Sequence, residues 1–193
     1  MNIEKIETFK YYESFNGSYG VKLPDQELEY IHSLCMNSYP YETGGILIGR
    51  YSDDLKWAEI TTITGAPAES KQTLCSFVRS TRGIITKLKR AWQKQQYYLG
   101  EWHYHPNASP KPSALDLKTM VNLSKDEDLG CPEPILLVIG GSSSNWLEMS
   151  RNVQSGNTQN LKSSAAPVRL PAAPASTPGT SQAATQAGCV YRP

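Results

Sequence analysis

The chain has 193 residues, of which 39% are hydrophobic and 9% aromatic, which is enough apolar surface for one globular core. Its formal net charge is +1, but residues 151–193 carry four cations and no acid, so residues 1–150 have a net charge of −3. These values exclude a fibrous or wholly disordered protein and argue against nucleic acid as the main partner.

No membrane segment is predicted. The opening sequence MNIEKIETFKYY lacks the apolar region of a signal peptide, and the longest apolar run, residues 135–139, is far too short to span a bilayer. The four cysteines are scattered without a Cys-x-x-Cys pair, so we expect neither a zinc ribbon nor a disulfide framework. We therefore expect a cytoplasmic protein whose cysteines are ordinary small side chains.

The first elements predicted are a helix and a β-hairpin. Pro24 stands at a plausible first helical position of a helix that ends near Asn37, and His32 lies off its apolar face as an ordinary histidine. That face consists of Leu28, Ile31, Leu34 and Cys35. The β-rich runs GGILIGRY and KWAEITTITG follow, separated by polar residues that favour a hairpin, and CSFVRS can add a third strand.

A basic helix is predicted next, over residues 81–96. Its apolar residues recur at helical spacing, and most of its lysines and arginines lie on the other side. The apolar face consists of Ile84, Ile85, Leu88 and Trp92. We interpret the basic cluster as a solvated helix face, with a docking patch for an acidic partner as the alternative.

The second half of the chain predicts strand, helix, strand and strand, at residues 97–106, 113–125, 134–141 and 145–150. The sum is an α/β domain with a mixed sheet, which we assign to residues 1–150. Residues 151–193 are rich in Ser, Ala and Pro and show no periodic apolar face, so we expect a disordered tail there.

Two of the three histidines of the chain lie in the strand predicted at residues 97–106. Successive side chains of a strand alternate between its faces, so His103 and His105 project from one side, whereas Trp102 and Tyr104 project from the other. Two imidazoles on one face can share a metal ion.

Ser113 and Asp116 begin the helix that follows this strand. Their spacing is that of a capping arrangement with an acid in the first turn, which taken alone is a structural device. The same geometry aims both side chains back toward the end of the strand, so Asp116 can complete a site with His103 and His105. Three protein ligands and one open position are typical of a catalytic zinc, and we predict that this site binds Zn²⁺.

Hydrolysis at such a zinc also requires a group that takes a proton from water and returns it to the leaving amine. Glu42 is the first candidate, because it precedes an apolar β-run and is followed by Gly44 and Gly45, which permit close backbone approach. A solvated acid at the start of a strand is the alternative. Glu101 is the rival base, but its position two residues before His103 suits it better to orient that ligand.

The complete pattern is Glu42, His103-x-His105, seven residues, then Ser113-x-x-Asp116. It resembles the motif of the JAMM (MPN+) zinc isopeptidases, and the resemblance spans roughly residues 20–150. The resemblance implies a deaminase-like three-layer α/β fold, and zinc held by the two histidines and the aspartate.

The resemblance also implies roles and a reaction. Glu42 would be the general acid/base, Ser113 would help to stabilise the tetrahedral intermediate, and the reaction would hydrolyse the amide after the C-terminus of a ubiquitin-like protein. Tyr104 departs from the small Ser or Thr often found between the histidines. Because its side chain points away from the metal face, we expect it to affect packing or the substrate edge rather than zinc binding.

Within that family the chain is most similar to stand-alone bacterial deconjugases encoded beside cGAS-like nucleotidyltransferases (CD-NTases) in anti-phage operons. This likeness implies a protein substrate with an extended C-terminus, either a ubiquitin-like conjugate or such a nucleotidyltransferase joined to its target. Two alternatives stay open: a processor of sulfur-carrier proteins or amino-acid conjugates, and a non-catalytic scaffold of the same fold.

Overall fold

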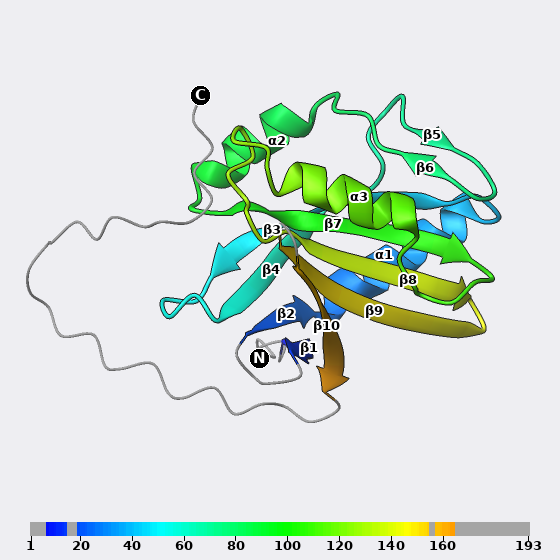
Figure 1. The fold of residues 1–193 in the computed structure, drawn as a ribbon. Helices are drawn as coiled ribbons and strands as arrows, with labels where there is room; N and C mark the ends of the chain where they lie inside the picture. The colour runs from blue at the N-terminus through cyan, green and yellow to red at the C-terminus, as the bar shows by residue number, and fades with distance from the viewer. Residues whose placement is uncertain (1–6, 15–18, 155–156, 165–193) are drawn as a thin grey trace, which may run out of the picture.

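The computed structural model describes residues 7–14, 19–154 and 157–164. Eight strands form a closed sheet in the order β1, β10, β9, β8, β7, β3, β4 and β2, and β5 and β6 form a separate hairpin (Figure 1). The strands are β1 (Phe9–Ser14), β2 (Gly20–Pro24), β3 (Thr43–Tyr51), β4 (Trp57–Ile63), β5 (Lys71–Gln72), β6 (Phe77–Val78), β7 (Tyr97–Pro106), β8 (Ile135–Ser142), β9 (Asn145–Gln154) and β10 (Asn157–Ser164).

The closed sheet is mixed, as predicted. The pairs β2–β4 and β7–β8 are parallel and the other neighbouring pairs are antiparallel, including the predicted hairpin of β3 and β4. Strand β7 runs between β3 and β8 and bulges near Gly100. That glycine has φ of 146°, and a Cβ there would lie 1.9 Å from the carbonyl oxygen of Ile135, so a side chain would push β7 away from β8.

Helix α1 (Asp25–Ser38) covers one face of the sheet, while α2 (Ile84–Trp92) and α3 (Ala114–Leu123) cover the other (Figure 1). The α1 side holds the largest hydrophobic cluster, in which Trp102 and Tyr104 of β7 pack with Ile31 of the helix. On the opposite face, α2 and α3 pack over separate clusters from β3, β7 and β8. The prediction of a three-layer α/β fold is confirmed.

Two details of the helices differ from the sequence prediction. Ile84, Leu88 and Ala91 are the buried residues of α2, whereas Ile85 and Trp92 are 53% and 49% exposed. The buried positions repeat at i, i+4 and i+7, and Ile85 and Trp92 lie on the adjacent stripe of the helix. In α1, Leu34 is only partly buried, while the other three residues of its predicted apolar face are buried.

Residues 151–154 and 157–164, which belong to the segment expected to be a disordered tail, form strands in the structure. Residues 151–154 end β9, and β10 pairs with both β9 and β1, so the closed sheet includes residues up to 164. Backbone pairing can stabilise a strand that has no periodic apolar face. This segment is mostly polar, so its sequence offered no such face from which a strand could be predicted. Residues 165–193, the remainder of the predicted tail, lie outside the described residues.

Three of the four cysteines lie in the described residues. Cys35 and Cys131 are buried in hydrophobic clusters and Cys75 is exposed, whereas Cys189 lies outside the described ranges. Among the described residues, no helix is long and apolar enough to cross a membrane.

Candidate metal centre

Strand β7 presents its two histidines on the face that α2 and α3 cover. Trp102 and Tyr104 alternate with them and are buried on the α1 side, as the strand periodicity predicts. The imidazole of His103 is almost fully enclosed, with the whole residue 8% exposed. His105, two residues nearer the end of the strand, is half-buried.

Asp116 reaches the histidines from the first turn of α3. A capping box fixes the start of this helix: the Ser113 hydroxyl accepts from the Asp116 backbone N–H at 3.1 Å, and the Ser113 N–H donates to Asp116 Oδ2 at 2.7 Å. The Ser113 hydroxyl also donates to Oδ2 at 2.7 Å. The capping device therefore holds the carboxylate in place as well as the helix end.

The three side chains form a compact group of metal donors. Asp116 Oδ1 lies 2.9 Å from His103 Nδ1, and Asp116 Oδ2 lies 3.5 Å from His105 Nε2. One donor atom from each residue lies within 4.8 Å of the other two. Tetrahedral zinc with bonds of about 2.0–2.1 Å would set neighbouring ligand atoms about 3.3 Å apart, so the donor set and its spacing fit such an ion.

The pKa values of His103 and Asp116 depend on each other. Burial lowers the pKa of His103, but hydrogen bonds to Asp116 and Glu101 outweigh burial and raise that pKa to about 9. Burial raises the pKa of Asp116, but hydrogen bonds from His103 and His105 hold it well below its ordinary value. In the metal-free protein, a protonated His103 therefore pairs with an ionised Asp116.

Glu42 stands at the entrance of β3, next to the histidines. Thr43 pairs with Tyr104 in the antiparallel register, which brings the preceding residue, Glu42, to the end of β7 that carries His105. Burial raises the pKa of Glu42, the two histidines lower it and Asp116 raises it, and the net shift is upward. A carboxylate with a raised pKa is suited to proton transfer near neutral pH.

Glu101 is engaged more deeply in the protein than Glu42. It is 2% exposed, and its Oε1 accepts from Arg79 Nη2 at 2.6 Å and from Arg79 Nε at 2.9 Å. Burial raises the pKa of Glu101, but the hydrogen bond to His103 and the Arg79 charge bring it below its ordinary value. A carboxylate held in this way is a poor proton shuttle.

Sequence reasoning missed Arg79 and Phe77, two residues of the β5–β6 region that reach the site. The Phe77 ring packs edge-on against the His103 ring, with centroids 5.7 Å apart. Neither residue belongs to a recognisable motif, and the short runs around them carry no periodicity that could predict the contact.

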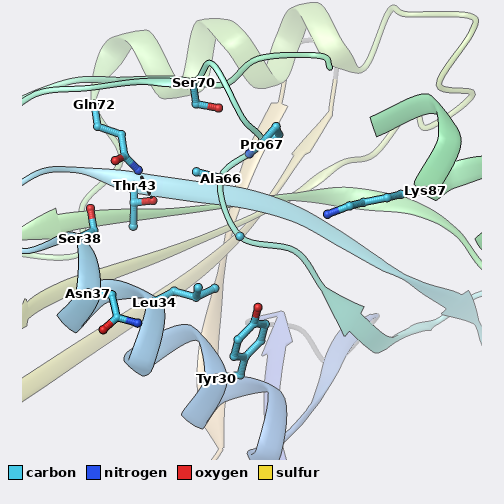
Figure 2. A pocket seen from close by; sticks show the side chains of 11 residues that line it. Tyr30, Leu34, Asn37, Ser38, Thr43, Ala66, Pro67, Ser70, Gln72 and Lys87 are labelled. Atoms are coloured by element: carbon cyan, nitrogen blue, oxygen red, sulfur yellow. Dashed lines mark hydrogen bonds between the residues drawn. The ribbon is translucent and has the colours of Figure 1, made fainter. Parts of the chain in front are cut away.

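An open groove of about 540 Å³ has Thr43, the first residue of β3, among its lining residues. Figure 2 shows side chains from α1, the start of β3, the segment before β5 and α2 around it, with Lys87 extending toward the groove from α2. Its lining residues are Tyr30, Leu34, Asn37, Ser38, Thr43, Gly65, Ala66, Pro67, Ser70, Gln72 and Lys87. Since Thr43 follows Glu42 directly, the groove and the metal-donor group lie at one end of the same strand pair.

Residues 24–153 match the family described as prokaryotic homologs of the JAB domain. The CD-NTase/cGAS isopeptidase of Enterobacter hormaechei is 35% identical over 142 residues, which are 74% of this chain and 79% of that relative. The probable metalloprotease y4qB of Sinorhizobium fredii is 27% identical over 65% of this chain and 78% of its own length. The solution structure of protein DSY2949 from Desulfitobacterium hafniense shares the fold, with a TM-score of 0.55 at 21% identity over 71% of this chain and 86% of that one.

Proposed function

The chain belongs to the family of prokaryotic JAB-domain homologs, and we propose that it is a zinc-dependent isopeptidase. The observation that carries this proposal is the group formed by His103, His105 and Asp116, with Glu42 beside it. Two imidazoles and one carboxylate are the kind of three-ligand set that catalytic zinc sites use.

We further propose that the substrate is a CD-NTase joined through its C-terminus to a target protein. The support is a relative named CD-NTase/cGAS isopeptidase that matches 74% of this chain. The reaction would release the nucleotidyltransferase from its target in the cytoplasm, as part of anti-phage defence. No nucleic acid or membrane has a role in this proposal.

Each site residue has a distinct role in the proposed reaction. His103, His105 and Asp116 would hold the ion, which when bound supplies a Lewis acid and lowers the pKa of water to near 7. Glu42, whose pKa is raised, takes a proton from the attacking water and delivers it to the leaving amine. Ser113 keeps Asp116 oriented through its backbone N–H, while its hydroxyl, which donates to Asp116 Oδ2 in this structure, would by resemblance to the family turn to donate to the oxyanion of the tetrahedral intermediate.

The groove beside Glu42 suits the extended end of a protein substrate. It is lined mainly by small and polar side chains, and one of them, Thr43, directly follows the proposed base in the sequence. The proline-rich excursion at residues 107–112 is less suited to strand addition. Asn107 N–H donates to the Gly141 carbonyl, and Gly141 N–H donates to the Ala108 carbonyl, so the backbone at its start is already paired.

The test uses purified protein and a CD-NTase whose C-terminus is fused to a reporter. We expect the zinc-loaded protein to release the reporter, a chelator to stop cleavage, and added zinc to restore it. Glu42→Gln should keep zinc and lose about 10²- to 10⁴-fold in rate, whereas Glu29→Gln, an exposed control on α1, should cleave normally.

Three results would contradict parts of this proposal. Full zinc binding by a His103→Ala/His105→Ala variant would remove the metal assignment. Normal cleavage by Glu42→Gln, together with a zinc-loaded but inactive Glu101→Gln, would make Glu101 the base. Cleavage of a sulfur-carrier fusion in preference to the CD-NTase fusion would support the alternative substrate class, and no cleavage of any fusion would support a scaffold.

A further inference from the structure

A buried ion pair between Arg79 and Glu101 lies next to the metal-donor group and takes no part in the proposed reaction. Arg79, just after β6, donates twice to Glu101 Oε1, and both side chains are largely buried, at 14% and 3% exposed. Glu101 Oε1 also accepts from the Tyr98 hydroxyl at 3.4 Å. Burying two charges costs desolvation energy that their attraction often fails to offset, so such a pair is a poor device for stability alone.

The second oxygen of Glu101 faces a metal ligand. Glu101 Oε2 lies 3.5 Å from His103 Nε2, while His103 Nδ1 lies on the other side of the ring, 2.9 Å from Asp116. An imidazole that binds a metal through one nitrogen usually donates the N–H of the other to a carboxylate or a carbonyl, and this contact fixes its tautomer and orientation. Glu101 lies where that acceptor is required.

We propose that Glu101 and Arg79 are positioning residues that fix the His103 ring and thereby set the affinity of the site for its metal. Glu101 accepts from the His103 ring, and Arg79 anchors Glu101 through two N–H donors that converge on Oε1. The inference rests on the metal site of the proposed function, but not on its substrate or its reaction.

The segment that carries Arg79 also contacts the His103 ring directly. Phe77 of β6 packs edge-on against the imidazole, two residues before Arg79. Gly44 makes room for this ring, because a Cβ there would lie 2.8 Å from Phe77 Cε1 and 2.4 Å from the Trp102 carbonyl oxygen. Figure 1 shows the β5–β6 hairpin at the end of the molecule toward which β7 points. The position of this hairpin is therefore linked to the orientation of a metal ligand.

The experiment measures zinc affinity by competition with a chelator, for the full-length protein without substrate. We expect Glu101→Gln to weaken zinc binding by about 10- to 100-fold, because the amide replaces a charged acceptor, and Arg79→Gln to weaken it in the same direction by less. Arg82→Gln is the matched control: Arg82 lies three residues further on and forms an exposed ion pair with Glu69. Its affinity should equal that of the wild type.

A spectroscopic readout separates positioning from a general loss of stability. The chain has three histidines, so ¹⁵N-histidine labelling gives a ring spectrum that can be assigned by substitution. In the zinc-loaded wild type we expect His103 to show one ligated nitrogen and one strongly hydrogen-bonded N–H. This N–H signal should move in Glu101→Gln and Arg79→Gln and stay unchanged in Arg82→Gln.

Additivity supplies a further test. If Arg79 acts through Glu101, the double variant Arg79→Gln/Glu101→Gln should bind zinc as weakly as Glu101→Gln alone. Should Arg79→Gln fail to fold, Arg79→Lys, which keeps the charge but loses the two-pronged contact, should show an intermediate affinity. Wild-type zinc affinity in Glu101→Gln, an unmoved His103 signal or strictly additive losses would each overturn the proposal. A wild-type protein that binds zinc but cleaves no substrate would contradict the proposed function alone.

Discussion

Asp116 shows how one side chain serves both the local fold and the site. Its backbone N–H and its carboxylate close the capping box that begins α3, while the same carboxylate faces His103 and His105. The motif spacing of Ser113 and Asp116 therefore reflects a helix start and a metal ligand together. For this reason the spacing predicted the helix start, and together with His103 and His105 it predicted the metal ligand.

The protonation of His103 leads to a prediction about pH. Its pKa in the folded, metal-free protein is about 9, above the ordinary value of 6.5, so the proton stabilises the metal-free fold. This contribution is fully present below about pH 6.5 and is lost as pH rises through about 9. A metal must displace the proton, so apparent zinc affinity should rise about tenfold per pH unit below pH 9.

The measurement is thermal unfolding of the metal-free and zinc-loaded protein between pH 6 and pH 9. We expect the difference in Tm produced by zinc to grow with pH. A His103→Asn variant should lack the pH-dependent loss of metal-free stability. A zinc effect that is constant over this range would mean that His103 carries no proton at neutral pH.

At the scale of secondary structure, the elements with strong local signals were predictable and the others were not. β7, α3, β8 and the β3–β4 hairpin each have a periodic pattern or a turn signal, and the structure confirms them. β1 and β10 pair with each other although they lie at opposite ends of the described chain, and no local pattern encodes such a partner.

The same distinction applies to the site. The two histidines and Asp116 follow from strand alternation and helix capping, which are local rules. The contacts of Arg79 and Phe77 with the site depend on how the β5–β6 hairpin folds back onto β7. Tertiary packing decides that placement, so the sequence predicted an orienting role for Glu101 but not the arginine that holds it.

Strand β10 carries a prediction that reverses the expectation for a disordered tail. Deleting residues 157–193 removes the strand that joins β1 to β9 and opens the closed sheet. We expect the Tm to fall by more than about 5 °C, which corresponds to a loss of about 2 kcal/mol in a domain of this size. Deleting residues 165–193 is the control, and from its composition we expect little change.

Thermal melts of the two truncated proteins and the full-length chain decide the matter. If the shorter protein, without residues 157–193, melted together with the other two, β10 would add nothing to stability. A large drop on deleting residues 165–193 would instead show that the final segment contributes to the fold.

At the scale of the whole molecule, the groove gathers residues that are far apart in sequence. α1 contributes one wall, the segment before β5 the other, and Thr43, the first residue of β3, lies between them (Figure 2). Because all three elements are anchored on the closed sheet, the groove is formed before substrate binds. A preformed groove lowers the ordering cost of holding an extended chain.

The final prediction tests whether this groove holds the end of the substrate. Ala66 lines the groove, whereas Ala68, two residues further on, is exposed and does not line it. Ala66→Trp should fill part of the groove and lower kcat/KM by about tenfold or more, equivalent to at least about 1.4 kcal/mol, mainly through KM. Zinc affinity should stay unchanged, and Ala68→Trp should behave as the wild type. Carriers with Trp next to the scissile bond should also be cleaved slowly, whereas different sequences after that bond should be tolerated. Equal kcat/KM for the two tryptophan variants would exclude the groove as the binding site for the substrate C-terminus.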